Sequence, residues 1–327
     1  MNDTSLRAHP AGPSSPKTKA FATTPLTSTG ATPPAIPWRR LLVHLDGSPR
    51  SAERLALARR MAGRSGATLV AMHAVTPVWA EMPMSALGDA GAGVLLQEAQ
   101  AERRRSARAV YDREAARPGA PMCWHDACDL SAVGWGAAAT AFGARALCSD
   151  VVVLGQRDPD DALTWGVPTD FIPDVVAYSG RPTLVVPRVG HFDTVGRRVL
   201  VAWKPAREAA RALATALPLL QHAQHVEVAH WRESGESRVG RPAPEASTAA
   251  HGALQDWLHA HGIPAHHTVQ GDAHADLGEQ LLSLAADVDA DLLVMGCYGH
   301  NRTREWLLGG ATRTLLQSMT VPVWMAH

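Results

Sequence analysis

Short apolar runs alternate with stretches of helical periodicity from about Arg39 onward. The first five runs are residues 41–45, 68–75, 122–125, 151–154 and 183–186, and residues 51–62 have the period of a helix. Strands that are apolar along their whole length and separated by helices are typical of a parallel sheet covered on both faces. The pattern therefore predicts an α/β fold.

A second series of the same kind follows. Its runs are residues 199–203, 226–231, 265–269, 292–295 and 321–325. The letters repeat as well, since LLVHLDGSPRSAERLALARRMA (41–62) is echoed by VLVAWKPAREAARALATALPLL (199–220), and DVVVLG by DLLVMG. Such a repeat predicts two copies of one domain. We expect a first domain at 38–188, a linker at 189–197 and a second domain at 198–327.

Residues 1–37 are rich in Pro, Ser, Thr, Ala and Gly and poor in large apolar side chains. A segment that buries so little surface cannot offset its ordering entropy, so we expect a disordered tail. An organellar transit peptide is the alternative, because the stretch is also poor in acids.

Composition narrows the class of protein. The 31 basic residues balance the 31 acidic ones, which argues against broad attraction to nucleic acid or an anionic membrane. The four cysteines form no CxxC pair and do not indicate a disulfide scaffold. No apolar run approaches the roughly eighteen residues of a membrane span, and the N-terminus lacks a secretory core. We expect a soluble, cytoplasmic protein.

The segment LLVMGCYGHNRTREWLLGGAT, residues 292–312, carries the main candidate site. A buried-strand run is followed by Gly296 and Gly299, which let the backbone turn its N–H groups toward an anion. Gly309 and Gly310 allow a second close approach. Thr312 offers a hydroxyl, and a helix from about Ala311 would direct unpaired N–H groups at a phosphate.

This spacing, GxxG, nine residues and then Gly, resembles the nucleotide-binding loop of the universal stress protein family. The resemblance covers nearly everything after the tail and implies two tandem five-stranded parallel-sheet domains, Rossmann-like and similar to adenine nucleotide alpha hydrolases. It implies ATP, with Mg, as the cofactor. The residues it assigns to binding in the second domain are Met295, Gly296, Gly299, Gly309, Gly310, Ala311 and Thr312. The family usually closes the loop with Gly followed by Ser or Thr, where this chain has Gly310.

The first domain carries a partial set, Asp46 and Gly155. Asp46 stands at a strand end, where its carboxylate either accepts hydrogen bonds from a nucleotide or, like Ser48, caps the next helix. After Gly155 the second glycine of GxxG is missing, and the following acids, Asp158, Asp160 and Asp161, fit a hydrated turn better than a metal site. The second domain has Lys204, Pro205 and Ala206 where the first has Asp46, Gly47 and Ser48.

Other polar residues carry weaker signals. Arg103, Arg104 and Arg105 lie among acids and indicate a solvated helix face. His300, Arg302 and Arg304 follow the glycine loop and either contact a phosphate or are exposed. Five histidines (His259, His261, His266, His267 and His274) lack zinc-site spacing, so no metal is assigned.

No P-loop, GxSxG or comparable catalytic motif is present, so we do not expect an enzyme beyond incidental ATP hydrolysis. Two functions are favoured: a nucleotide-responsive regulator of stress tolerance, and a scaffold of the same fold that binds no nucleotide. A third, binding of another small apolar or anionic ligand in the crevice, ranks last. The family's last strand commonly pairs with its counterpart in another domain. Here residues 184–186 and 323–325 would pair within the chain, with a homodimer and an unknown protein partner as further possibilities.

Overall fold

The computed structural model describes residues 33–76, 90–127, 137–232, 244–272, 277–297 and 310–327. The strands are β1 (Arg40–Leu45), β2 (Thr68–His73), β3 (Met122–Asp126), β4 (Val151–Gly155), β5 (Thr183–Val186), β6 (Arg198–Ala202), β7 (His225–Arg232), β8 (His266–Asp272), β9 (Leu292–Gly296) and β10 (Val323–Ala326). The helices are α1 (Arg50–Ser65), α2 (Ala90–Ala115), α3 (Ala137–Ala146), the 3-10 helix η3 (Ala162–Thr164), α4 (Phe171–Ser179), α5 (Arg207–Leu220), α6 (Pro244–Ala260), α7 (Leu277–Asp287) and α8 (Gly310–Ser318).

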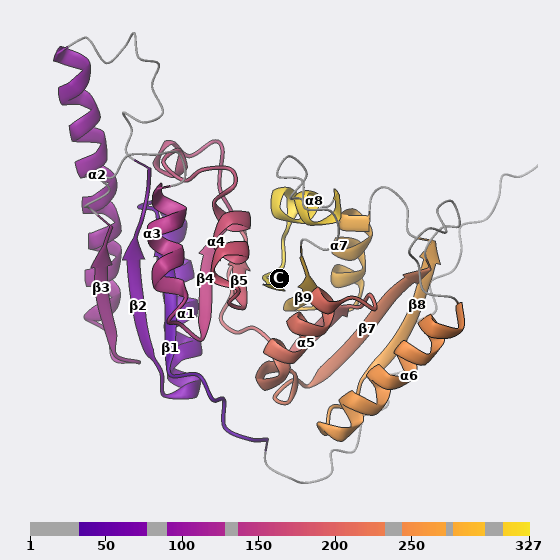
Figure 1. Cartoon of the computed structure of the whole chain (residues 1–327). Coiled ribbons are helices and arrows are strands. Elements are labelled where there is room, and N and C mark those ends of the chain that lie inside the picture. Colours follow the sequence, from indigo (N-terminus) through magenta and orange to yellow (C-terminus); the bar gives the residue numbers. More distant parts are fainter. Residues whose placement is uncertain (1–32, 77–89, 128–136, 233–243, 273–276, 298–309) are drawn as a thin grey trace, which may run out of the picture. The chain divides into compact units, whose positions relative to one another are not determined.

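Within these residues the strands form one sheet in the order β3-β2-β1-β4-β5-β10-β9-β6-β7-β8 (Figure 1). Neighbours inside each half are parallel, so the predicted α/β fold with two five-stranded series is confirmed. The two series meet where β10 pairs antiparallel with β5, Trp324 facing Leu184. The predicted pairing within the chain is therefore confirmed.

Helices cover both faces of this sheet. Side chains of α1, α2, α5 and α6 pack in one buried cluster, and those of α3, α4, α7 and α8 pack in a second on the opposite face. Strand alternation explains the division, because Leu41 and Val43 enter the first cluster and Leu42 enters the second. Each cluster draws residues from both halves of the chain.

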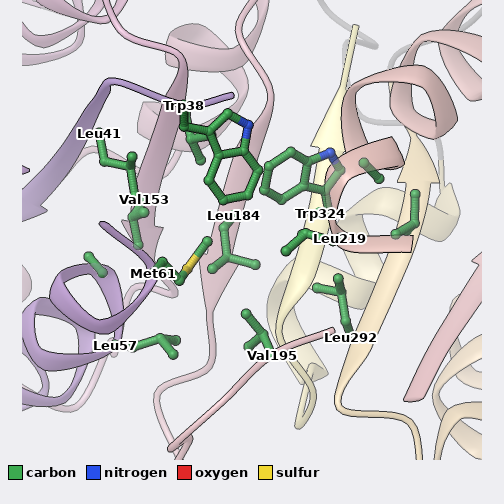
Figure 2. Close-up of a cluster of buried hydrophobic side chains, with 14 of the residues drawn as sticks. Trp38, Leu41, Leu57, Met61, Val153, Leu184, Val195, Leu219, Leu292 and Trp324 are labelled. Carbon is green, nitrogen blue, oxygen red and sulfur yellow. The ribbon is translucent and has the colours of Figure 1, made fainter. Parts of the chain in front are cut away.

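The junction between the halves is apolar (Figure 2). Trp38, just before β1, stacks on Trp324 of β10 with ring centroids 5.7 Å apart and planes inclined by 18°. Leu184 and Val195 lie in the same cluster. Ile36 is buried there too, although the sequence placed it in the tail, whose residues 1–32 lie outside the described part.

The segment predicted as a linker is fastened to α1. Arg60 donates to the carbonyls of Phe192 and Asp193, and Arg50 donates to that of Gly190. Glu53 in turn accepts a hydrogen bond of 3.0 Å from the Phe192 N–H. Residues 32–327 form one compact unit, and the domain boundaries stay a prediction.

Candidate functional site

The strand order places one crevice in each half. β1 lies between β2 and β4, and β6 lies between β7 and β9, so the chain order reverses between β1 and β4 and between β6 and β9. In open α/β sheets, ligands bind beyond the carboxyl ends of the strands at such a reversal. The two candidate sites therefore lie next to Asp46 and Gly155 in the first half and next to Gly296 in the second.

Asp46 is buried, and its carboxylate is occupied by groups of the chain itself. It accepts hydrogen bonds from Ser48 Oγ at 2.7 Å, from Ser51 Oγ at 2.6 Å and from the Ser48 N–H at 3.0 Å. Its second oxygen pairs with Arg54 Nη2 at 3.1 Å. Neither Asp46 nor Ser48 caps α1, since no side chain hydrogen-bonds to the start of that helix.

Arg54 fills the first crevice. Its side chain is only 2% exposed, and Nε donates to the His44 carbonyl at 2.7 Å. A Cβ added to Gly155 would lie 1.5 Å from Arg54 Nη1, so only glycine at 155 leaves room for the guanidinium. The position where the sequence predicted a ligand thus holds a cation of the protein.

Electrostatics favour this arrangement. Burial would raise the pKa of the Asp46 carboxyl, but the Arg54 charge and the two serine hydroxyls hold it well below its usual range. His44, two residues before Asp46, is buried between Phe142 and Phe171 and donates to the Ala74 carbonyl at 2.7 Å. Burial lowers the pKa of His44 to about 4, so this imidazole is neutral at pH 7.

Helix α2 packs against the same region. Arg103 is 6% exposed and donates to the Ala162 carbonyl of η3 at 3.2 Å, while Ser106 donates to the Gly47 carbonyl at 2.7 Å. The prediction of a solvated face is therefore wrong for Arg103. It holds for Arg105, an exposed residue paired with Glu102.

The acidic stretch after β4 is internally bonded. Asp161 accepts from the Leu163 N–H at 2.9 Å and so caps η3, and Asp158 pairs with Arg188 at 3.1 Å. Among the described residues no group of three or more His, Cys, Asp or Glu is placed to hold a metal ion.

In the second half the backbone of α5 approaches the end of β9. A Cβ on Gly296 would lie 2.4 Å from the Ala209 N and 2.5 Å from the Glu208 carbonyl carbon. Glycine is thus required for the helix to pack against the strand, whatever else binds there. Glu208 is buried and pairs with Arg207 at 2.6 Å.

The C-terminal half matches a known family in sequence. The model of the Universal stress protein family matches residues 196–327. This part of the chain is therefore similar to that family. The resemblance predicted from the glycine spacing is confirmed.

Solved structures extend the likeness to both halves at the level of the fold. A universal stress protein from Archaeoglobus fulgidus DSM 4304 superposes with a TM-score of 0.56 at 15% identity, covering 88% of this chain and 95% of that one. A functionally unknown protein from Pseudomonas aeruginosa PAO1 gives 0.50 at 14% identity, covering 88% and 92%. Among curated proteins none matches this chain.

The nucleotide-binding residues predicted in the second half are distributed as follows. Gly299 and Gly309 lie outside the described residues, as do His300, Arg302, Arg304 and His274. Gly310 is the first residue of α8, and Ala311 and Thr312 follow in its first turn, the latter buried. Met295 is buried in the core beside Met325 of β10.

The remaining predicted histidines are dispersed. His261 packs on Trp257, and His266 stacks on His225 with centroids 5.1 Å apart. Along β8, His266 pairs with Glu227 of β7, and the next residue, His267, pairs with Val228, which packs in the cluster of α6. His266 and His267 therefore face opposite sides of β8, as the sequence predicted.

Two residues with structural roles at these sites were not predicted. One is Arg54, whose place in a helix suggests a solvent-exposed side chain. The repeat, however, aligns Arg54 with Ala212, which is buried. The other is Gln156, which donates to the carbonyls of Leu316 at 3.1 Å and Gln317 at 2.9 Å at the end of α8. Gln156 thus ties the end of β4 to the second half.

In the described residues, each helix is too short or too polar to cross a membrane.

Proposed function

We propose that the second half binds ATP, as its Mg complex, at the glycine loop between β9 and α8, and that the nucleotide regulates the protein in a stress response. This proposal rests on the two elements that flank the loop, β9 and α8. β9 ends in Gly296 beside β6, where the strand order reverses, and α8 opens at Gly310. The first N–H groups of a helix have no partner within it and favour an anion.

The first half is proposed to bind no nucleotide, which departs from the partial set Asp46 and Gly155. The guanidinium of Arg54 lies against Gly155, and the acceptor oxygens of Asp46 already receive internal donors. A ligand there would have to displace a buried ion pair, and leaving one buried charge unpaired costs about 3–5 kcal/mol. We therefore expect one ATP per chain.

The role of the nucleotide is proposed to be regulatory. Hydrolysis of ATP requires a base or a water-positioning group aligned with the γ-phosphate, and the described residues beside the two crevices present no such group. ATP would instead act through its contact with the loop ahead of α8. The end of α8 is held by Gln156 of the first half, so the bound state would be sensed across the junction.

A scaffold without nucleotide is the second candidate, and a specific observation favours it. Lys204 and Pro205 follow β6 where Asp46 and Gly47 follow β1, so the second crevice lacks the carboxylate of the first. The junction of β5 with β10 would then be the functional feature. Because that pairing is made within the chain, a homodimer would need another surface.

Calorimetric titration of Mg-ATP into the full chain tests both candidates. A tryptophan at position 299 should fill the proposed phosphate cradle, so Gly299→Trp should abolish binding. The matched control is Gly252→Trp, because the space around the Cβ position of Gly252 on α6 is open. It should bind like the wild type.

The stoichiometry separates the outcomes. One ATP per chain, lost in Gly299→Trp and kept in Gly252→Trp, supports the nucleotide-binding function. Two ATP per chain would contradict the closed first site. Absence of heat together with absence of thermal stabilisation at millimolar ATP would leave the scaffold, since a ligand at a hundred times its Kd stabilises a fold by roughly 2.7 kcal/mol.

A further inference from the structure

The two halves place an arginine at the same position. Leu41 pairs with Val151 and Val199 with Leu292, so Arg40 at the start of β1 corresponds to Arg198 at the start of β6. The backbone N–H of each is held by an aspartate, that of Arg40 by Asp150 and that of Arg198 by Asp291, both at 2.9 Å. The side chains, however, have different surroundings.

In the second half the guanidinium has a partner. Arg198 Nε and Nη2 donate to the Val288 carbonyl, four residues before β9, at 3.0 and 2.8 Å. The corresponding carbonyl of the first half belongs to Leu147, four residues before β4. It accepts instead from Arg181 Nε and Nη2 at 3.0 and 2.5 Å. Arg40 is thereby excluded from the acceptor that its counterpart uses.

Arg40 Nε is buried and has no hydrogen-bond partner among the described residues. Leu42 packs in the cluster of Phe142 and Ala146 of α3, and alternation along β1 places Arg40 on that same face. Asp150 lies close by, but its Oδ2 accepts from the N–H groups of Arg39 and Arg40.

A second guanidinium lies in the same region. Arg145, in the last turn of α3, stands where the second half has Ala286. Its Nε is also buried without a partner in the described part of the chain. Both arginines influence His125 of β3, whose pKa is lowered by burial and then by the charges of Arg145 and Arg40. His125 also pairs with Met72 of β2, which packs in the same cluster as Leu42 and Phe142, so the three groups lie on one face of the first half.

Two half-buried cations that form no ion pair with a described carboxylate are costly, and an anion between them would offset that cost. We propose that Arg40 and Arg145 bind a compact oxyanion of the phosphate type on the α3 face of the first half. A guanidinium offers a planar fork of donors that matches two oxygens of a phosphate. Arg40 starts β1, so this site is at the opposite end of the strands from the crevices and is independent of ATP binding.

Titration of inorganic phosphate into the full chain, in phosphate-free buffer, tests the site by calorimetry and by melting temperature. The wild type should bind one phosphate and be stabilised by it. Losing one charge-assisted contact should weaken binding roughly tenfold or more in Arg145→Gln and in Arg40→Gln. Arg105→Gln, which removes an exposed arginine already paired with Glu102, is the control and should bind normally.

Stability gives a second readout. Without phosphate, Arg145→Gln should melt at or above the wild-type temperature, because the change removes an uncompensated cation. The ring proton resonances of His125 in the wild type should shift on addition of phosphate, which needs no variant. Glycerol 3-phosphate distinguishes a phosphomonoester from free phosphate, according to which of the two binds more tightly.

Three results would overturn the proposal. These are an absence of binding at millimolar phosphate, binding unchanged in Arg145→Gln and in Gly299→Trp alike, and binding lost in Gly299→Trp but kept in Arg145→Gln. The last would assign the phosphate to the glycine loop of the second half. Retention of phosphate binding in Gly299→Trp, with ATP binding lost, would show that the two sites are separate.

Discussion

Replacing Trp38 with alanine tests whether the two halves share one core. Trp38 precedes β1, is 6% exposed and stacks on Trp324 of β10 (Figure 2). A buried tryptophan removes about 150–250 Å² from water, which at about 25 cal/mol per Å² corresponds to about 4–6 kcal/mol. Relaxation of the cavity brings the expected loss for Trp38→Ala to about 3–5 kcal/mol.

Urea unfolding followed by far-UV circular dichroism measures this loss, since the backbone signal does not depend on the indole. Because the apolar cluster around Trp38 includes residues of both halves, we expect a single transition shifted to lower urea. Trp165→Ala is the control, as Trp165 is 53% exposed and makes one hydrogen bond to the Pro159 carbonyl. It should cost less than about 1 kcal/mol.

A double-mutant cycle with Trp324→Ala isolates the stack itself. Aromatic pairs contribute about 0.5–1.5 kcal/mol beyond their buried area, so the two losses should fall short of additivity by that amount. A loss below about 1 kcal/mol for Trp38→Ala, or strictly additive losses, would refute the shared core. Two separate transitions in the wild type would do so as well.

Three further predictions concern the crevices. Arg54→Met should lower the free energy of unfolding by about 3–5 kcal/mol in urea titrations at pH 7, because it leaves the Asp46 charge buried without its partner. His44 has a folded pKa of about 4 against 6.5 unfolded, so about 3 kcal/mol of stability should be present above pH 6.5 and be lost as the pH falls toward 4, and His44→Gln should flatten this dependence of the urea midpoint. Gly296→Ala should lower the melting temperature well below that of Gly252→Ala, since its methyl group meets the α5 backbone.

Each of these has an outcome that would contradict it. An Arg54→Met variant as stable as the wild type would mean that Asp46 is protonated or solvated. An unchanged pH profile in His44→Gln would show that His44 takes up its proton in the folded state as readily as in the unfolded one. Equal melting temperatures for the two glycine variants would show that α5 does not lie against β9 as described.

The strands were the most predictable feature. Buried parallel strands must be apolar on both faces. Runs such as residues 151–154 and 292–295 can therefore be recognised as strands without knowledge of the fold. The repeat predicted two series of five strands. The family resemblance predicted the pairing of β5 with β10. Each of these signals is local in the sequence or shared by two copies of it.

Arg54 could not be placed from the sequence. A polar residue on a helix is usually solvated, and its burial here depends on the absence of a Cβ at Gly155, about a hundred residues away. Glycine at the end of β4 was interpreted as an opening for a ligand, whereas in the structure it accommodates a side chain. Comparison with Ala212 offers one signal for the burial of Arg54. A change from Ala to Arg at a core-facing position requires a buried counter-charge, which Asp46 supplies.

The repeat also explains why the two halves have come to differ at their polar ends while keeping one backbone. Strand interiors must stay apolar in both copies, but a strand end needs only that each buried charge or carbonyl has a partner. In the first half Asp46 is satisfied by Arg54, which closes the crevice, and Leu147 is satisfied by Arg181, which excludes Arg40. In the second half Arg198 takes the equivalent carbonyl itself. Because the partners differ, different polar groups are left without a hydrogen-bond partner in each half. At those groups each half can acquire a ligand of its own.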